Sequence, residues 1–362
     1  MSTSYLYKDK ASACLRKRAL LAIPVAGLLI GPGAATVAYG DGDPLVTISL
    51  TPSIAPNSVP DDAVMTSDGT TGYGVVPYEY RIGTTEVTNN QYVTFLNAVD
   101  SDGANALGLF NTTNSVYYGI TWNGTSGEYE VKTDYGQKPM VFVSIYNAMR
   151  FTNWLTNGAT AEASTETGVY NLLGGTATPE NPKVGRDLTG LSGTVFAIAS
   201  ENEWYKAAYW KGTDNVGEDN YYTYAGSDDL DAVNANYNND TGSASDLRDV
   251  AGGLISASGT FDQSGNVWEW NDMLVTTWND TDLGELNVRG LRGGAFNYGG
   301  ENSSSLWRSY SQRVEDGSRH IGFRVVSLTI LAAVPEPGTY AAAMGLMILI
   351  TGVWIRRGRR TR

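Results

Sequence analysis

The spacing of the helix signals limits most strongly how this chain can fold. Three short segments carry such signals, and the stretches between them are long and rich in Gly, Asn, Asp and Thr. Thr88 with Gln91 and Ser200 with Glu203 have the spacing of capping boxes, and Ser144 precedes a third apolar stripe of helical period. Short runs such as VWEW and GFRVV have the composition of strands. The pattern predicts a loop-rich α+β domain with few regular elements.

Loops of this length inside a compact domain are uncommon unless something orders them. The charge of the chain is suited to bound cations. Residues 39–334 hold 15 Lys and Arg against 36 Asp and Glu, a net charge of −21. Such a surface is a poor partner for nucleic acid or anionic lipid and a suitable one for divalent cations.

The N-terminal residues 1–38 have the layout of a secretory signal peptide. Basic residues 16–18 precede an apolar run over 19–30, and small residues follow up to Ala38, where we expect cleavage. A buried core helix is the alternative, but the prolines and the basic flank argue against it. The single cysteine, Cys14, would leave with this peptide, so no disulfide, thiolate nucleophile or cysteine metal site is expected in the exported protein.

The C-terminal residues predict a membrane helix. Residues 339–355 form an uncharged run of 17 residues, and four arginines follow within the next five positions. By the positive-inside rule these arginines stay cytoplasmic, and the rest of the chain faces outward. An ordinary C-terminal anchor would have the same pattern.

Five stretches in a fixed order carry a resemblance to a known family. They are YRIGTTEVTNNQYVTFLNAV (80–99), KPMVFVSIYNAMRFTNWL (138–155), FAIASENEWYKAAYW (196–210), FDQSGNVWEW (261–270), and LRGGAFNYG (291–299) closed by HIGFRVV (320–326). Together they resemble the formylglycine-generating enzyme family, also called the sulfatase-modifying factor domain. The resemblance covers residues 73–328 and implies a single loop-rich α+β domain related to the C-type lectin fold. Residues 39–72 are then expected to be a linker or a peripheral strand.

The C-terminal tail carries a second resemblance. The motif VPEP at 334–337, the apolar run and the basic end, together residues 334–362, resemble the PEP-CTERM signal of exopolysaccharide-producing Gram-negative bacteria. This resemblance implies processing by an exosortase-type enzyme. It also implies delivery to the cell envelope or extracellular matrix, with a transient or lasting hold on the inner membrane through the C-terminal helix.

The family resemblance implies bound calcium at one or two positions. The first site would use the side chains of Glu86 and Asp262, with main-chain carbonyls of Gln263, Gly265 and Val267. The second would use Asn236 and the carbonyl of Tyr237, with Asp240 or Asp246 replacing an acidic ligand that is out of register. Ordinary Asn/Asp turn chemistry is the alternative reading of both groups.

The same resemblance implies that the catalytic centre is altered. Family enzymes use a copper ion held by two cysteines, and those positions, counted from Arg292, fall on Tyr298 and Ser303. Neither side chain supplies a thiolate for Cu(I), so copper is not expected. His320 is the single histidine and cannot form a facial triad; we expect it to be structural.

Several residues of the recurrent motifs have both a structural and a functional reading. Trp268 and Trp270 share one face of a probable strand, and core packing is preferred for them, with Glu269 on the other face. Arg292 and Arg324 are expected to pair with carboxylates that hold the loops. The loop at 292–308 still offers candidates for a recognition surface, namely Arg292, Phe296, Tyr298, Ser303 and Trp307.

Two functional hypotheses follow. The first is an exported, non-catalytic domain, stabilised by calcium, that binds an envelope or matrix polysaccharide or protein. The alternative is a protein-modifying oxidoreductase with a rebuilt metal centre. A purely structural matrix component would have neither activity.

Overall fold

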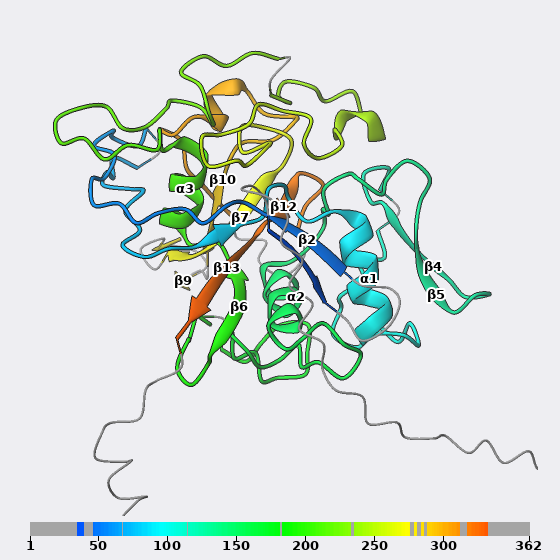
Figure 1. The fold of residues 1–362 in the computed structure, drawn as a ribbon. Helices are drawn as coiled ribbons and strands as arrows, with labels where there is room; N and C mark the ends of the chain where they lie inside the picture. Colours follow the sequence, from blue (N-terminus) through cyan, green and yellow to red (C-terminus); the bar gives the residue numbers. More distant parts are fainter. Residues whose placement is uncertain are drawn as a thin grey trace, which may run out of the picture. The chain divides into compact units, whose positions relative to one another are not determined.

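The structure is a computed structural model that describes residues 35–39 and 46–331, except 67, 114, 182, 233–234, 276–278, 281–283, 286–287 and 312–316. Its elements are β1 (Ala35–Tyr39), β2 (Val46–Leu50), β3 (Arg81–Ile82), α1 (Asn89–Val99), β4 (Ile120–Asn123), β5 (Glu128–Val131), α2 (Ile145–Thr156), β6 (Gly193–Ile198), α3 (Glu201–Tyr209), η1 (Ala244–Asp246), β7 (Trp268–Val275), β8 (Asn279–Asp280), β9 (Gly284–Glu285), β10 (Val288–Arg292), η2 (Gly300–Ser303), β11 (Ser309–Ser311), β12 (Ile321–Phe323) and β13 (Val325–Ile330). The predicted fold class, a loop-rich α+β domain, is confirmed (Figure 1).

The three helices begin where their caps predict. Thr88 accepts a hydrogen bond from the Gln91 amide while the Gln91 side chain accepts from the Thr88 amide, and Ser200 and Glu203 form the same reciprocal box. Ser144 caps α2 in the simpler form. Local hydrogen bonding therefore fixes each helix start independently of the long loops between them.

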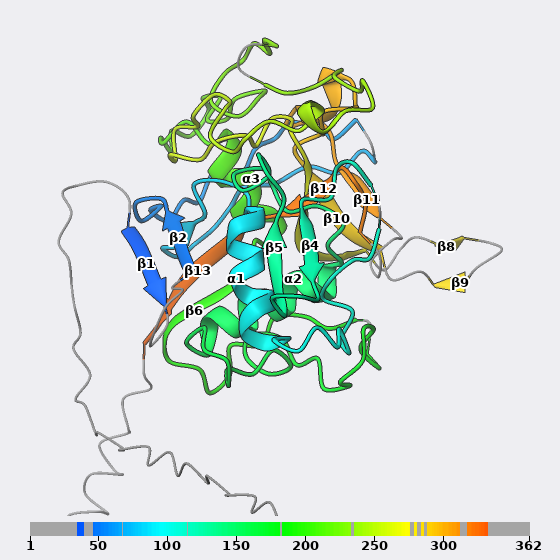
Figure 2. The ribbon, with the colours of Figure 1, turned by 90° about the vertical axis from the view of Figure 1, so that its right-hand side faces the viewer.

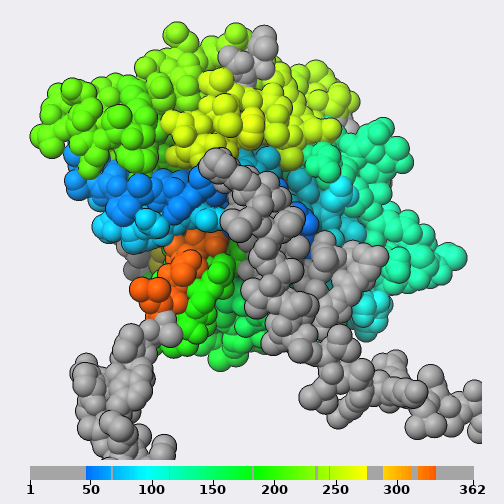
Figure 3. Space-filling view, in the orientation of Figure 1, coloured from blue at the N-terminus to red at the C-terminus, as the bar shows by residue number. Residues whose placement is uncertain are grey.

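Two sheets organise the domain. The first has the strand order β11-β10-β7-β12, and the second has the order β3-β13-β6. β12 runs parallel to β7, whereas β10 runs antiparallel to it and pairs Arg292 with Glu269. In the space-filling view, the surface residues of β13 (orange) and β6 (green) lie side by side, as their pairing over 325–330 requires (Figure 3). The end of β10 delivers the 292–308 loop beside the tryptophans of β7.

One arginine joins the two sheets. Arg324 is the single residue between β12 and β13, and it is completely buried. Its Nε and Nη2 each donate to a carboxylate oxygen of Glu269 over 2.6 Å, and Nη1 donates to the Gly83 carbonyl over 3.0 Å. The expected pairing of this arginine with a carboxylate is confirmed.

Side chains of both sheets contribute to one buried core. Trp268 and Trp270 are buried in it, which confirms the preference for core packing; Glu269, between them in sequence, is equally buried. Aromatic rings of α1, α2 and β12 pack together around Phe151 and Trp154.

Residues 46–65 belong to this core as well. The side chains of β2 alternate between buried and exposed, and Ile54 and Met65 are also buried. This part of the segment predicted as a linker or a peripheral strand thus contains strand β2 and packs on the domain. Within residues 35–39 and the described parts of 46–331, no helix combines the length and the apolar character needed to cross a bilayer. The predicted membrane helix and sorting signal lie outside the described residues, as does the signal peptide up to residue 34.

The tight contact between Gly265 and Asn236 generates a stability prediction. Gly265 has φ +102°, and a Cβ there would lie 2.4 Å from the Asn236 carbonyl oxygen, which is backbone and cannot move aside. Gly127 has φ +72° with no atom within 4 Å of such a Cβ. A left-handed conformation alone costs a side chain about 1–2 kcal/mol. We expect Gly127→Ala to cost that amount and Gly265→Ala about 3 kcal/mol or more, measured by urea unfolding. Equal losses in the two variants would show that the contact is not tight.

Candidate functional site

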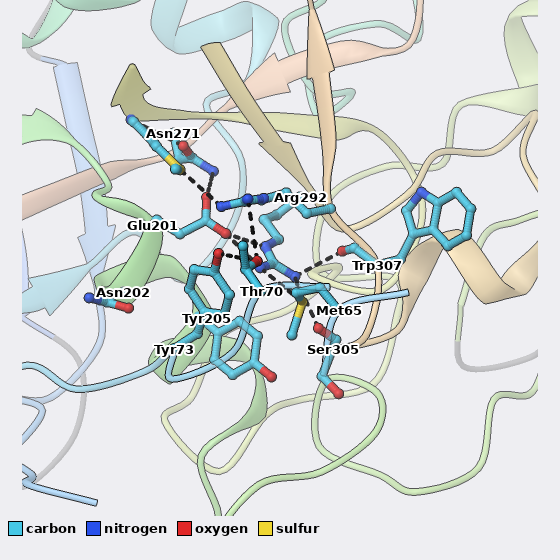
Figure 4. A network of polar contacts seen from close by, with 12 residues as sticks. Met65, Thr70, Tyr73, Glu201, Asn202, Tyr205, Asn271, Arg292, Ser305 and Trp307 are labelled. Carbon is cyan, nitrogen blue, oxygen red and sulfur yellow. Dashed lines mark hydrogen bonds and ion pairs between the residues drawn. The ribbon is translucent and has the colours of Figure 1, made fainter. Parts of the chain in front are cut away.

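Arg292 is a buried structural centre. Its Nε donates to Glu201 over 2.6 Å, and both side chains are almost completely shielded from solvent. Its Nη1 donates to the carbonyls of Ser305 and Trp307 over 3.0 and 2.8 Å (Figure 4). Glu201 lies in the first turn of α3, where the helix dipole favours a carboxylate. The Arg292 guanidinium thus holds the end of the 292–308 loop against α3. The expected pairing of Arg292 with a carboxylate is confirmed.

The same guanidinium lies between aromatic rings. It is 5.2 Å from the ring centroid of Tyr73 and 4.9 Å from that of Tyr205. Its terminal nitrogens also contact the sulfur of Met65 over 3.5 and 3.6 Å. Two of these neighbours, Met65 and Tyr73, come from the N-terminal part of the domain, so Arg292 joins that segment to α3 and to the loop (Figure 4).

A second arginine, Arg308, closes the loop and holds Tyr310. Its Nε donates to Asp68 over 3.1 Å, and the Tyr310 hydroxyl donates to the same carboxylate oxygen. The guanidinium lies 5.0 Å from the Tyr310 ring centroid. Burial, followed by the hydrogen bond to Asp68, raises the pKa of Tyr310 well above its usual range, so its hydroxyl is a donor at neutral pH.

These contacts shape a pocket of about 380 Å³ at the end of the first sheet. It is lined by Trp268, Leu291, Tyr298, Ser309, Tyr310, Ser318, His320 and Ile321. Tyr298 meets Trp268 edge to face at 5.6 Å and 81°, and meets His320 at 5.2 Å and 76°. Among the residues that the structure describes, the lining contains aromatic rings, two serine hydroxyls and an imidazole, and no carboxylate, ammonium or guanidinium group. It can offer stacking surfaces and neutral hydrogen bonds.

The structure separates the five candidates of the 292–308 loop. Tyr298 lines the pocket, and Trp307 is half-buried, with its ring directed away from Arg292 (Figure 4). Arg292, Phe296 and Ser303 are each 0% exposed. Phe296 stacks on Tyr117, and the buried Ser303 hydroxyl has no hydrogen-bond partner among the described residues. Of the five, only Tyr298 reaches the pocket.

Sequence reasoning missed most of the pocket lining. Trp268 was expected only in the core, yet the same buried ring forms part of the wall. His320 was expected to be structural, and Tyr310 lies beyond the 292–308 loop. The one usable signal was the position of Trp268 at the start of β7, opposite the end of β10, because residues at such strand ends share one edge of a sheet.

The residues predicted for the first calcium site form a buried acidic cluster. Glu86 and Glu269 are 0% exposed and Asp262 is 6% exposed. Arg324 is the positive charge beside them: it pairs with Glu269 and lies 4.0 Å from Glu86 Oε2. Glu86 Oε1 accepts from Asn266 over 2.9 Å, whereas Oε2 accepts no hydrogen bond from any residue that the structure describes. Three carboxylates therefore share one guanidinium, an excess of two negative charges when all are ionised.

This excess perturbs the ionisation of two of the carboxyl groups. Burial, and then the nearby charge of Asp262, raise the pKa of Glu86 well above its usual range. Burial also raises the pKa of Asp262, although the Ala251 amide, which donates to it over 2.6 Å, opposes the shift. The folded protein therefore favours either a proton or a cation at this position.

The other predicted ligands of the first site lie in the same segment. Gln263 is buried, with its amide donating to the Trp204 carbonyl over 3.2 Å, and Gly265 donates to the Gly293 carbonyl over 2.7 Å. Val267 is fully buried. In the part of the chain that the structure describes, no three His, Cys, Asp or Glu side chains are arranged to hold a metal. An ion here would have to use main-chain carbonyls together with Glu86 and Asp262, as the predicted ligand set does.

At the second predicted calcium position, both candidate carboxylates bond to protein groups. The buried Asn236 amide donates to the Asp246 carbonyl over 2.7 Å, and Tyr237 beside it is half-buried. The Asp246 carboxylate accepts from the amides of Thr241 and Ser243, the second of these in the capping box of η1, whereas Asp240 forms an ion pair with Arg319 at 2.7 Å. Both candidate carboxylates are thus engaged with protein groups, which agrees with the turn-chemistry alternative.

A larger cavity, of about 530 Å³, lies over β2 and the start of α1. The part of its lining that the structure describes is made of neutral side chains, mainly threonines with Asn90, Gln91 and Gln137, and includes no aromatic ring. It offers hydrogen bonds without a stacking surface, so the smaller pocket has the more specific chemistry.

Comparison with known proteins identifies the relatives of this architecture. The family model described as "Sulfatase-modifying factor enzyme 1-like domain" matches residues 66–328. Among solved structures, Treponema denticola variable protein 1 is similar with a TM-score of 0.51 and 20% identity, covering 82% of this chain and 99% of its own. CarF has a TM-score of 0.47 and 18% identity over 75% and 98% of the two chains. PvdO from Pseudomonas aeruginosa has 0.46 and 16% over 80% and 97%. No curated protein matches the chain.

The buried ion pair leads to a testable prediction. Glu201→Gln leaves the Arg292 charge buried without its partner, so we expect it to lower the free energy of unfolding by about 3–5 kcal/mol. Glu128→Gln, on the exposed face of β5, makes the same chemical change in water and should alter it by less than about 0.5 kcal/mol. Denaturant unfolding of the two variants measures the difference. A small effect at Glu201 would mean that the pair does not hold the loop.

Proposed function

The chain belongs to the sulfatase-modifying factor enzyme 1-like family, and on that basis we propose that it is an exported, non-catalytic domain that binds a polysaccharide of the cell envelope or matrix. The observation that carries the proposal is the pocket walled by Trp268, Tyr298 and Tyr310 beside the 292–308 loop. A protein ligand at the same surface is the other form of this hypothesis, and the binding experiment below separates the two.

The pocket has the chemistry that a neutral sugar needs. Aromatic rings provide apolar faces for the C–H groups of a pyranose, while tyrosine hydroxyls, serines and an imidazole provide directional hydrogen bonds. The lining residues that the structure describes are uncharged and offer no cationic partner to an anionic glycan. The expected ligand is therefore an uncharged segment of an exopolysaccharide.

The residues at the former copper positions favour binding over oxidation. Tyr298 is a stacking surface, and Ser303 is buried beneath the loop, so neither can present a soft ligand to the pocket. The described residues contain no cysteine. The alternative, an oxidoreductase with a rebuilt metal centre, has no observation in its favour.

The location of the protein is proposed from the sequence of its ends. The leader and the PEP-CTERM-like tail support export and processing by an exosortase-type enzyme, with residence in the envelope or matrix. A binding domain for an exopolysaccharide would be delivered there to the layer that contains its ligand.

Calcium is proposed as a structural ion at Glu86 and Asp262. Two observations support an ion with hard oxygen ligands: the excess of two negative charges when all three carboxyl groups are ionised, and the Oε2 of Glu86, which accepts no hydrogen bond from the described residues. When bound, calcium would neutralise the negative charge that Arg324 leaves uncompensated. It would also hold the 250–251 segment, whose Ala251 amide donates to Asp262, against the strand–helix junction at Glu86.

Binding at the pocket is tested with two variants at one position. We expect Tyr298→Ala to weaken binding of a purified neutral exopolysaccharide at least tenfold, because it removes the ring that stacks on the ligand. Tyr298→Phe keeps the ring and should stay within about threefold of the wild type, since one neutral hydrogen bond contributes about 0.5–1.5 kcal/mol. Calorimetric titration measures both. Unchanged binding in Tyr298→Ala, or binding only to an envelope protein, would contradict the glycan site.

The calcium proposal is tested by thermal unfolding. At a calcium concentration 100 times Kd, binding to the native state alone adds about 2.7 kcal/mol. For a domain of this size we expect the melting temperature to fall by roughly 5–10 °C in excess chelator. Glu86→Gln should abolish the calcium response, whereas Asp240→Asn should retain it because Asp240 pairs with Arg319. A chelator that leaves the wild-type melting temperature unchanged rules out the site.

A further inference from the structure

Strand β2 is held along one edge by the domain and along the other by β1. Ser49 accepts from the Thr84 amide, and Thr51 donates to the Ile82 carbonyl, so the odd-numbered residues bond toward the domain. β1 pairs antiparallel with β2 along the other edge, from Ala35 opposite Leu50 to Tyr39 opposite Val46 (Figure 2). The backbone groups of Val46, Ile48 and Leu50 therefore face β1.

The expected cleavage site of the leader lies within β1. β1 covers residues 35–39, and the leader is expected to be cut near Ala38, within the strand. Cleavage there would remove most of β1 and leave the outward edge of β2 without its paired strand. An edge strand with free backbone donors and acceptors is a template for another strand.

We propose that the outer edge of β2 is a strand-acceptor site, occupied by Ala35–Tyr39 in the precursor and available to an extended peptide of another protein after the leader is cut. The occupant is an extended segment of about five residues with small or aromatic uncharged side chains, in antiparallel register with residues 46–50. The pairing of β1 with β2 over five residues shows that the backbone of such a segment fits the edge, and ATVAY is the sequence that occupies it. Recognition would come from main-chain hydrogen bonds, as in other cases of strand addition.

In the precursor, β1 blocks the outer edge of β2 because it is tethered beside it. A tethered strand has an effective concentration in the millimolar range for a short linker, which an external peptide of weak affinity cannot overcome. The site would then open only in the processed protein. The aromatic pocket is built from other elements, so this proposal stands or falls separately from the glycan proposal.

Two proline variants of the full chain, in detergent, test the proposal. Val37 lies opposite Ile48, in a pair whose backbone groups face each other, so Val37→Pro removes a donor to β2. Thr36 lies opposite Ser49, whose carbonyl bonds to Thr84, so the Thr36 amide points away and Thr36→Pro is the matched control. The probe is a fluorescent peptide with the sequence of residues 34–40.

We expect Val37→Pro to bind the peptide at least tenfold more tightly than the wild type or Thr36→Pro. Hydrogen exchange should show the amides of Ile48 and Leu50 protected in the wild type, exposed in Val37→Pro and protected again by the peptide. Melting temperatures confirm that the variants are folded. Protected amides in Val37→Pro without peptide, or exposed amides with no peptide binding, would each overturn the proposal.

Discussion

The buried ion pair between Arg292 and Glu201 is the interaction on which the rest of the site depends. Both charges lose their hydration, and a lone buried charge would cost several kcal/mol, so each is tolerated only while the other is in place. Arg292 also uses its remaining donors on the carbonyls of Ser305 and Trp307. The pair therefore sets the path of the chain from the end of β10 back to β11, and that path places Ser309 and Tyr310 in the pocket wall.

A second buried guanidinium, Arg324, has a different balance of charge. Arg292 faces one carboxylate, whereas Arg324 is surrounded by Glu269, Glu86 and Asp262. The charge of Arg292 is balanced by Glu201 alone. The carboxyl groups around Arg324 carry surplus negative charge when they are ionised, and a divalent cation would offset it. The contrast explains why one arginine serves as a fixed structural centre while the other lies beside a proposed ion site. Arg292 is the last residue of β10, and Arg324 follows the last residue of β12; residues of both strands line the pocket.

The predictable parts of this fold are those set by local chemistry. The caps at Thr88, Ser144 and Ser200 define helix starts through hydrogen bonds within three residues, so sequence spacing shows them directly. The paired tryptophans of β7 were identifiable as core from strand alternation, and the motifs of the family gave the fold class. The membership of residues 46–65 in the core was not evident, because it depends on contacts outside the segment: Ile54 bonds to Tyr80, and Asp61 accepts from Tyr205, 144 residues away.

The candidate site was predicted only in part for the same reason. Tyr298 was found because it occupies a family position, but Tyr310 depends on Asp68, a contact that spans 242 residues. Arg292 was read both as a structural group and as a surface candidate, and only its burial decides between the two. Spacing along a chain identifies which residues can act, whereas burial identifies which of them can meet a ligand.

The measurement that tests the central claim most directly is a crystal structure of the protein with a neutral oligosaccharide from its own exopolysaccharide. The account predicts a sugar ring packed on Tyr298, with its hydroxyls bonded to Ser309, Ser318 or His320. A sugar bound instead in the threonine-lined cavity over β2, or no sugar in the aromatic pocket at saturating concentration, would contradict it.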